Sequence, residues 1–188
     1  MHDYRQHLSE ESLEALSVLS ESKIQSVLSH SCDIEAGSSI LTVVSLSIPI
    51  GKRKFLIIEN DWADTPRDWI NYYFLSARIA TSPANIWYES EPGRGGANYK
   101  GDHLTLHLGA QNQVARIDVL SAVEMGSRES VHYDAGLLIT REDGLKLAIV
   151  RQESITGFLR IAYEARDITE LTAGLIIRVS LGPRRTLS

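Results

Sequence analysis

Cysteine is almost absent from this sequence, because Cys32 is the only one among 188 residues. A lone cysteine excludes an intramolecular disulfide and a thiolate zinc cluster within one chain. Long apolar runs are also missing: the longest extend over only a few residues, whereas a membrane-spanning helix needs about 20. The first twelve residues lack the basic start and apolar segment of a signal peptide. We therefore expect a cytoplasmic protein without a membrane span.

Basic residues are in the minority, with 19 Lys and Arg against 24 Asp and Glu and a formal net charge of -5. This balance disfavours a general affinity for the phosphate backbone, so we do not expect nucleic acid as a partner. The 43% apolar and 23% charged residues are ordinary for a globular protein. The length suits one domain that covers residues 1–188 and buries enough apolar surface to fold without disulfides or metals.

Motifs for nucleotide binding and for hydrolysis are missing as well. The glycine-rich loop 90–102 lacks the G-K-[ST] ending of a phosphate-binding loop and the G-x-G-x-x-G spacing of a dinucleotide site, and no G-x-S-x-G occurs. His103 and His107 fall in a strand-like pattern, where residues four apart are separated by about 13 Å. That distance is too long for the two imidazoles to share one metal. The sequence thus predicts neither a cofactor nor a metal site.

Two segments carry helix signals. In the N-terminal segment 8–30, Ser9 is a good N-cap and Glu10 lies in the first turn, where the helix dipole favours acids. Apolar residues then recur on one face, with serines in the middle where the helix can break into two pieces. Near the C-terminus, Asp167 and Glu170 match a capping box. We expect an N-terminal helix and a short helix near the C-terminus.

Alternating and β-branched segments predict most of the remaining chain as strands. Residues 40–48 and 53–59 read as a hairpin, and residues 136–150 form a clearer one because Asp143 and Gly144 make a strong turn signal. Further strands are expected at 103–108, 114–123, 157–163 and 175–181, with a turn at 109–113 and a flexible tail at 182–188. The sequence therefore predicts an α+β fold. Its mainly antiparallel sheet has about seven to nine strands, arranged as a sandwich or a strongly curled sheet.

Residues 66–80 carry two conflicting patterns. Thr65 as N-cap, Pro66 at the first helical position and Asp68 in the first turn favour a helix. The same segment alternates at Tyr73, Leu75, Ala77 and Ile79, and its aromatic residues are typical of a strand. We expect a helix that begins at Pro66, with a strand as the alternative.

Acidic residues gather where the strand that begins near residue 55 ends. Glu59 and Asp61 point to the same side if the strand continues, and Asp64 can reach back across the turn. Three such oxygen donors can hold Mg²⁺ or Ca²⁺, and a carboxylate pair can act as general acid and base. The spacing does not match a calcium-binding loop. A solvated strand end with helix caps explains the same residues, and no catalytic residue is assigned.

The aromatic residues are concentrated in one part of the sequence. Eight of the 13 lie between residues 62 and 99, several of them beside turns and charges. Such residues close a core, anchor a protein interface or stack on a small polar ligand. The expected binding residues are Asp61, Trp62, Asp64, Trp69, Trp87, Arg94 and Tyr99.

These observations lead to three functional hypotheses. The first is a non-catalytic binding or protein-interaction module that uses this aromatic and acidic surface, with a basic protein as a suitable partner. The alternative is a metal-assisted hydrolase that uses Glu59, Asp61 and Asp64. The third is a structural subunit of a homo-oligomer, joined through a sheet edge or through the N-terminal helix.

Overall fold

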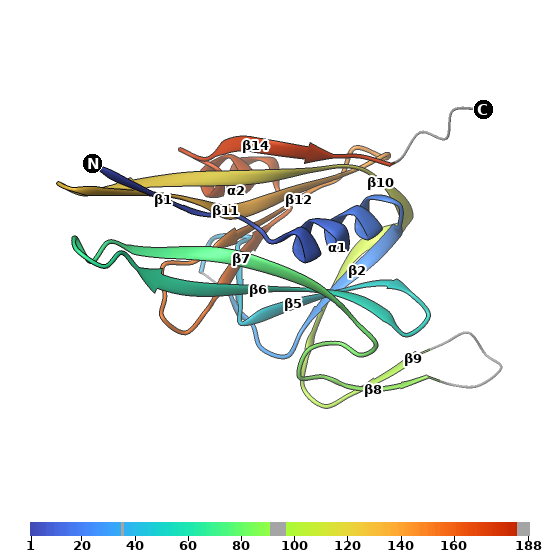
Figure 1. The fold of residues 1–188 in the computed structure, drawn as a ribbon. Coiled ribbons are helices and arrows are strands. Elements are labelled where there is room, and N and C mark those ends of the chain that lie inside the picture. The colour runs from blue at the N-terminus through green and yellow to red at the C-terminus, as the bar shows by residue number, and fades with distance from the viewer. Residues whose placement is uncertain (35, 91–96, 184–188) are drawn as a thin grey trace.

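One sheet contains twelve of the strands in the computed structural model, which describes residues 1–34, 36–90 and 97–183 (Figure 1). Its first strands are β1 (His2–Gln6), β2 (Lys23–Ser29), β3 (Asp33–Ile34), β4 (Leu41–Val43), β5 (Ser45–Gly51), β6 (Lys54–Asp64) and β7 (Asn71–Ala80). Its later strands are β10 (Leu104–Met125), β11 (Glu129–Arg141), β12 (Lys146–Arg151), β13 (Leu159–Ala162) and β14 (Ile176–Leu181). The strands β8 (Trp87–Ser90) and β9 (Ala97–Lys100) form a separate hairpin, and the helices are α1 (Glu10–Ser20) and α2 (Ala165–Leu171).

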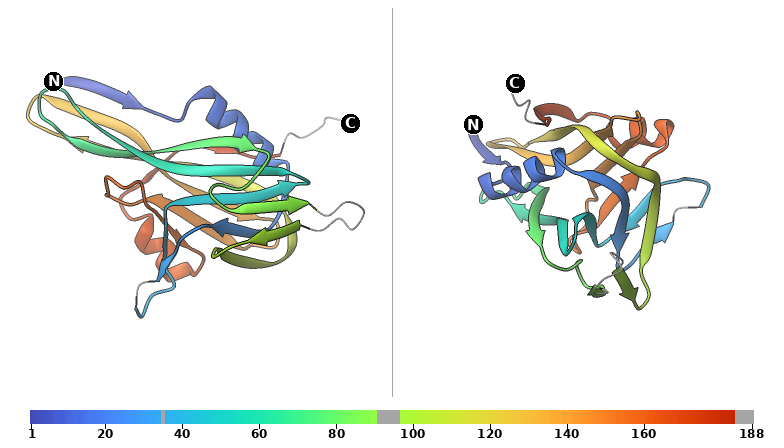
Figure 2. Two further views of the ribbon diagram at one scale, coloured as in Figure 1. Left: turned by 90° about the horizontal axis from the view of Figure 1, so that it is seen from below. Right: turned by 90° about the vertical axis from the view of Figure 1, so that its right-hand side faces the viewer.

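The sheet curls because β10 and the segment 41–51 each pair with strands of both of its halves. The long strand β10 pairs with β2 over residues 104–113 and with β14 over residues 117–121. Only Val44 separates β4, which pairs with β13, from β5, which pairs with β2 and β6. The order of neighbouring strands along this path through the sheet is β3-β4-β13-β12-β11-β10-β2-β5-β6-β7, and the two end strands, β3 and β7, do not pair with each other. The views in Figure 2 show the strands wrapping around a central core, with α1 on one side.

The α+β class and the mainly antiparallel sheet are confirmed, but the expected number of seven to nine strands is too low. Two strands of this sheet, β3 and β4, are only two and three residues long, which is too short for a period-2 pattern to be recognised. The strand β1 lies in a polar stretch and pairs in parallel with β11. The sheet is therefore larger than the periodic segments alone indicate, and it is curled and open.

The predicted helical segment 8–30 is wrong over its second half. Ser9 is the N-cap, since its side chain accepts a hydrogen bond at 3.1 Å from a backbone N–H of the first turn. Residues 23–29, however, form β2. Val27 and Leu28 are both fully buried, in two different core clusters, because this strand is covered on both faces. A strand of this kind loses its polar alternation and resembles one face of a helix.

Helix α1 packs against β7 and β10. The Ser12 hydroxyl donates a hydrogen bond to the Ala77 carbonyl at 2.9 Å and accepts one from the Ala77 N–H at 3.1 Å. Because β7 is the last strand of the path, these two backbone groups have no strand partner there, and the helix satisfies them. Leu16 extends from the same helix into the main core and is fully buried. Neither helix of the described chain has the length and apolar character that a membrane crossing requires.

The predicted helix at Pro66 is absent, because residues 71–80 form β7 and pair with β6 from Asp64 back to Phe55. Thr65 does behave like a cap, since its hydroxyl accepts a hydrogen bond at 3.1 Å from the N–H of Ile70. That bond closes a hairpin tip, however, and starts no helix. The alternation along β7 was the correct signal.

Other predicted elements are found with changed boundaries. Both hairpins are present, and Gly144 has a φ of 86° at the second turn. The predicted turn at 109–113 lies inside β10, whose register with β2 shifts there. The second helix is α2, but its N-cap is Glu164. The Asp167 carboxylate instead accepts hydrogen bonds from the backbone N–H and the hydroxyl of Ser39.

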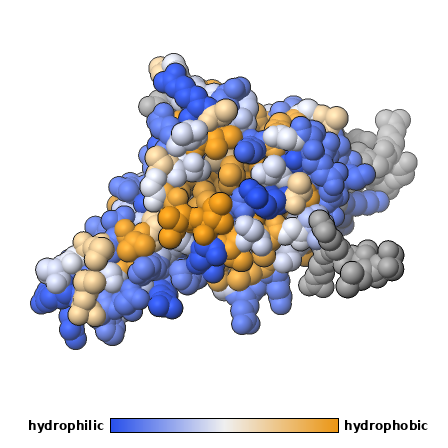
Figure 3. Space-filling model, turned by 90° about the horizontal axis from the view of Figure 1, so that it is seen from above, coloured by the Kyte–Doolittle hydropathy of each residue, from blue (hydrophilic) through white to orange (hydrophobic). Residues whose placement is uncertain are grey.

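Part of the predicted glycine-rich loop 90–102 is the strand β9. Residues 91–96, which include Arg94, and the last residues of the predicted tail, 184–188, lie outside the described residues. The face of the molecule that carries β14 and β1 is shown in Figure 3, where apolar side chains gather near the centre among polar ones.

Candidate functional site

The acidic residues at the end of β6 do not form a metal site. Glu59 and Asp61 lie on the same side of the strand, as expected, and both line a cavity of about 290 Å³. Asp64 is three residues further along and therefore points to the opposite side. In residues 1–34, 36–90 and 97–183, no three Asp, Glu, His or Cys side chains lie close enough together to hold a metal ion.

The segment 61–64 of β6 is an open strand edge, whereas Asn60 is buried and its side chain donates hydrogen bonds to the carbonyls of Gln152 and Phe158. The pairing of β5 with β6 ends at Glu59, whereas the pairing of β6 with β7 continues to Asp64. Asp61 and Asp64 are exposed along this edge. Charged side chains on an open edge oppose the addition of a foreign strand. The edge thus gives these acids a structural role.

Trp69 lies in a turn that a pair of carboxylates holds in place. Asp68 accepts hydrogen bonds from the backbone N–H groups of Arg128 and Glu129, at 2.6 and 3.0 Å. Glu129 in return accepts them from the N–H groups of Arg67 and Asp68, at 3.1 and 2.9 Å. The Arg128 backbone and side chain lower the pKa of Asp68 to about 2. The tips of the β6–β7 and β10–β11 hairpins are therefore joined, and Trp69 is left 71% exposed with a φ of 52°.

The structure does not bring the expected binding residues together. Trp62 and Trp69 belong to the β6–β7 hairpin and its tip, at one end of the molecule, whereas Trp87 and Tyr99 lie in the β8–β9 hairpin at the other end (Figures 1 and 2). The three tryptophans are exposed by 41%, 71% and 65%, in chain order, and Tyr99 packs beside the Phe55 cluster. The predicted aromatic and acidic surface is thus divided into two separate parts.

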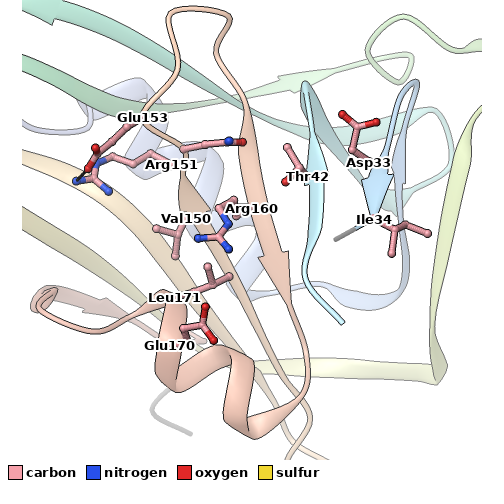
Figure 4. Close-up of a pocket in the computed structure, with 10 residues that line it drawn as sticks. Asp33, Ile34, Thr42, Val150, Arg151, Glu153, Arg160, Glu170 and Leu171 are labelled. Carbon is pink, nitrogen blue, oxygen red and sulfur yellow. Dashed lines mark hydrogen bonds and ion pairs between the residues drawn. The ribbon is translucent and has the colours of Figure 1, made fainter. Parts of the chain in front are cut away.

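A larger cavity lies elsewhere, on the outer face of the β3-β4-β13-β12 end of the sheet, and has a volume of about 620 Å³ (Figure 4). Its floor follows the strand register, in which Asp33 is opposite Thr42, Thr42 is opposite Arg160, and Arg160 is opposite Val150. Directly opposite residues point to the same face of a sheet. Four strands therefore supply one row of side chains, with the Arg160 guanidinium near its centre.

Helix α2 determines where this groove begins. Its Ile168 and Leu171 pack on Ala148, Val150 and Ala162 of the outer sheet face. The helix ends at Leu171 and covers Val150, whereas Arg160 and Thr42, the next residues of the same row, line the groove. Glu170 projects from the last turn of the helix and lines the groove (Figure 4). Aspartate and glutamate from β3 and α2 thus flank an arginine from β13.

The second arginine of the groove is held by its neighbours. Arg151 donates hydrogen bonds to the Tyr133 hydroxyl at 2.7 and 3.1 Å and lies 3.5 Å from Glu153. Burial raises the pKa of Tyr133 to about 12, so the phenol remains a neutral partner. The Tyr133 hydroxyl in turn donates to Glu124 at 3.1 Å. Arg151 therefore forms a fixed wall, and Arg160 is the arginine that lies in the row along the floor.

Comparisons with known proteins assign no family. No protein-family model, curated protein or solved structure matches this chain. The function must therefore be argued from the geometry.

Sequence reasoning missed the groove. Arg160 interrupts an apolar strand between Leu159 and Ile161, which shows only that it points away from the core. Asp33 and Glu170 lie in segments that are more than a hundred residues apart in the sequence. Only the order of the strands brings them to the same face.

Proposed function

We propose that this chain is a non-catalytic binding module whose site is the groove around Arg160. Its ligand is a short segment of a partner protein in which an acidic side chain lies next to a basic one. The row of side chains across four strands, with a guanidinium near its centre and carboxylates on either side, carries this proposal. A guanidinium binds a carboxylate through two parallel N–H···O bonds.

The dimensions of the groove suit a short segment. Neighbouring strands lie about 4.8 Å apart, so three steps from Asp33 to Val150 span about 14 Å. An extended peptide advances about 3.3 Å per residue, which corresponds to about four residues. Asp33 and Glu170 would receive a basic side chain on either side of a carboxylate bound at Arg160. The groove volume of about 620 Å³ lies within the range of ordinary ligand sites.

The residues of the groove support binding rather than chemistry. Its described lining contains two arginines, two glutamates, one aspartate and one glutamine, with Thr42 as the only hydroxyl group among these residues. Thr42 lies opposite Asp33 but does not donate a hydrogen bond to its carboxylate, so these two described residues do not form the activated nucleophile that covalent catalysis requires. The metal-assisted hydrolase is not supported either, because its three carboxylates do not converge.

Three six-residue peptides test this proposal: one with alternating Lys and Glu, one of Lys alone and one of Glu alone. Their affinities are measured by NMR titration of the ¹⁵N-labelled protein. We expect the mixed peptide to bind most tightly and to shift the amides of β13, β4 and α2. The substitution Arg160→Gln removes a charge-assisted pair worth about 1.5–3 kcal/mol, and should weaken this binding at least about tenfold.

The matched control is Arg78→Gln, which removes the same charge from β7, outside the groove. The Arg78 side chain is 50% exposed and lies 3.4 Å from Glu59. This variant should bind the mixed peptide like the wild type. Equal binding of the mixed peptide by Arg160→Gln and wild type would refute the site. Equal affinity for the all-Glu and mixed peptides would refute the role of the two acids.

A further inference from the structure

Another cavity, of about 200 Å³, lies on the outer face near β1 and β14 and is separate from the groove. Both basic and apolar side chains line it: Arg5, His7, His132 and Arg178, with Val123 and Ile176. Val123 and Ile176 are 40% and 61% exposed. Their strands, β10 and β14, lie on the side of the molecule shown in Figure 3, where apolar side chains gather among polar ones. The cavity thus combines basic groups with an apolar wall.

The strand register builds this cavity from two neighbouring rows. Arg5 on β1 is opposite His132 on β11, which is opposite Val123 on β10. In the next row, Asp134 on β11 is opposite Ser121 on β10, which is opposite Ile176 on β14. Opposite residues share a face, so all of these side chains project outward together.

A buried carboxylate fixes the basic groups. Asp134 is fully buried and accepts hydrogen bonds from Nε and Nη2 of Arg178, both at 2.7 Å. It also accepts one from the Ser121 hydroxyl at 2.7 Å, so this serine donates to the carboxylate rather than to a histidine. A guanidinium has five N–H donors, and Asp134 engages two of its nitrogens. Arg178 therefore keeps donors for a ligand in the cavity.

The protonation of the two histidines determines whether the groups around the cavity carry a net positive charge. Nδ1 of His7 is buried, accepts and donates no hydrogen bond, and lies 3.4 Å from a carboxylate oxygen of Asp134. Nε2 of His132 lies 3.2 Å from Asp3, which is also 3.5 Å from Arg5. With neutral imidazoles, Arg5 and Arg178 balance Asp3 and Asp134. Protonation of both imidazoles would add two positive charges to this balanced set.

We infer that this cavity is a pH-dependent site for a small carboxylate that carries a short apolar group. The carboxylate lies among Arg5, Arg178 and the two imidazoles, and the apolar group packs on Val123 and Ile176. The charged groups that face the imidazoles are Asp3 and Arg5 on β1, Asp134 on β11 and Arg178 on β14. Arg5 lies on β1, His7 directly follows this strand, His132 lies on β11 and Arg178 on β14, and the groove around Arg160 uses none of them.

Butyrate is the probe, titrated into the ¹⁵N-labelled protein at constant ionic strength at pH 6.3 and pH 8.0. The lower pH remains above the sequence pI of about 5.7. We expect shifts at residues 5–7, 121–123, 132–134 and 176–178. The affinity should be at least about tenfold higher at pH 6.3, since each protonated imidazole adds one positive charge near the bound carboxylate. Butylamine, with the opposite charge, should not produce these shifts.

Two variants at exposed positions separate the contribution of the arginine to butyrate binding from that of the histidine. Arg5→Gln should weaken butyrate binding at both pH values, and His132→Gln should reduce the ratio between them, while Arg78→Gln changes neither. Inorganic phosphate lacks the apolar group and should bind more weakly than butyrate. The inference is overturned if butyrate shifts other residues, if its affinity is the same at both pH values, or if phosphate binds as tightly. It is also overturned if His132→Gln and Arg5→Gln both bind like the wild type.

Discussion

The substitution Asp134→Asn tests the most heavily bonded side chain of the outer sheet face. Its carboxylate is fully buried and accepts four hydrogen bonds at 2.7 Å, from Leu8 N, the Ser121 hydroxyl and two nitrogens of Arg178. Asparagine keeps the shape but removes the charge, and its amide group turns donors toward donors. Arg178 then lies beside a neutral group.

The expected loss can be estimated from this arrangement. Breaking a buried ion pair by removing one partner costs about 3–5 kcal/mol. The Arg178 side chain is 27% exposed, so water can replace part of the lost interaction. We therefore expect the free energy of unfolding to fall by about 3 kcal/mol, the lower end of that range. For a chain of this length, each kcal/mol corresponds to about 2–4 °C, so the midpoint of thermal unfolding should fall by about 6–12 °C.

The pH dependence gives a second measurement of the same interaction. Burial by itself raises the pKa of Asp134, but hydrogen bonds from Arg178, Leu8 and Ser121 outweigh it, and the net pKa is lowered. A lowered folded-state pKa stabilises the protein above the unfolded value of about 3.9 and stops doing so as the pH falls through the folded value. The gap in the free energy of unfolding between wild type and variant should therefore be present from pH 7 down to pH 5 and close below about pH 4.

Urea unfolding monitored by circular dichroism measures both quantities. The control is Asp61→Asn, the same chemical change at an exposed position on β6, which should alter stability by no more than about 0.5 kcal/mol. If Asp134→Asn is as stable as this control, or if the gap persists unchanged at pH 3, the carboxylate does not stabilise the fold as argued.

Three further perturbations address other parts of the molecule. Leu16→Ala leaves a cavity in the main core, where the side chain is fully buried, and should cost about 2–5 kcal/mol in thermal unfolding; a loss below 1 kcal/mol would contradict this packing. Because the pKa of Asp68 is about 2, the hairpin tips should separate only in strong acid, and Trp69 fluorescence should change as the pH falls from 4 to 2. Asp68→Asn should give the acid spectrum already at pH 7, and an unchanged spectrum would rule out the clasp. Gly157 has a φ of 76° and an added Cβ would lie 2.7 Å from the Asn60 carbonyl oxygen, so Gly157→Ala should lower the free energy of unfolding by about 1–3 kcal/mol. A variant as stable as the wild type would show that the loop can move away.

The sequence predicts those elements whose signals are local. The β11–β12 hairpin follows from Asp143 and Gly144 at its turn, and the start of α1 follows from Ser9. Both depend on residues within a few positions of one another. Where the deciding interaction is distant, the prediction fails. Asp68 looks like a residue of a first helical turn, but its partners Arg128 and Glu129 lie sixty residues away.

Burial on two faces explains the error in residues 23–29. Ile24, Val27 and Leu28 fit the spacing of a helix face, and all three are fully buried. They are buried because β2 lies between β10 and β5 and is covered on both faces. Neither neighbour can be known before the topology is known. The same limit applies to the groove, whose Arg160 and Asp33 become neighbours only through β4.

The position of the open edge gives the acids of β6 a structural explanation. β5 leaves β6 at Glu59, because the preceding strand β4 belongs to the other half of the curled sheet. Residues 61–64 therefore have β7 as a partner on one side only, and Asp61 and Asp64 protect the other side. The conspicuous sequence pattern of a tryptophan between two acids, at residues 61–64, follows from this exposed edge. Charges that keep other strands away from an edge resemble charges that attract a ligand, and the two can be distinguished only by finding which backbone groups lack a neighbour.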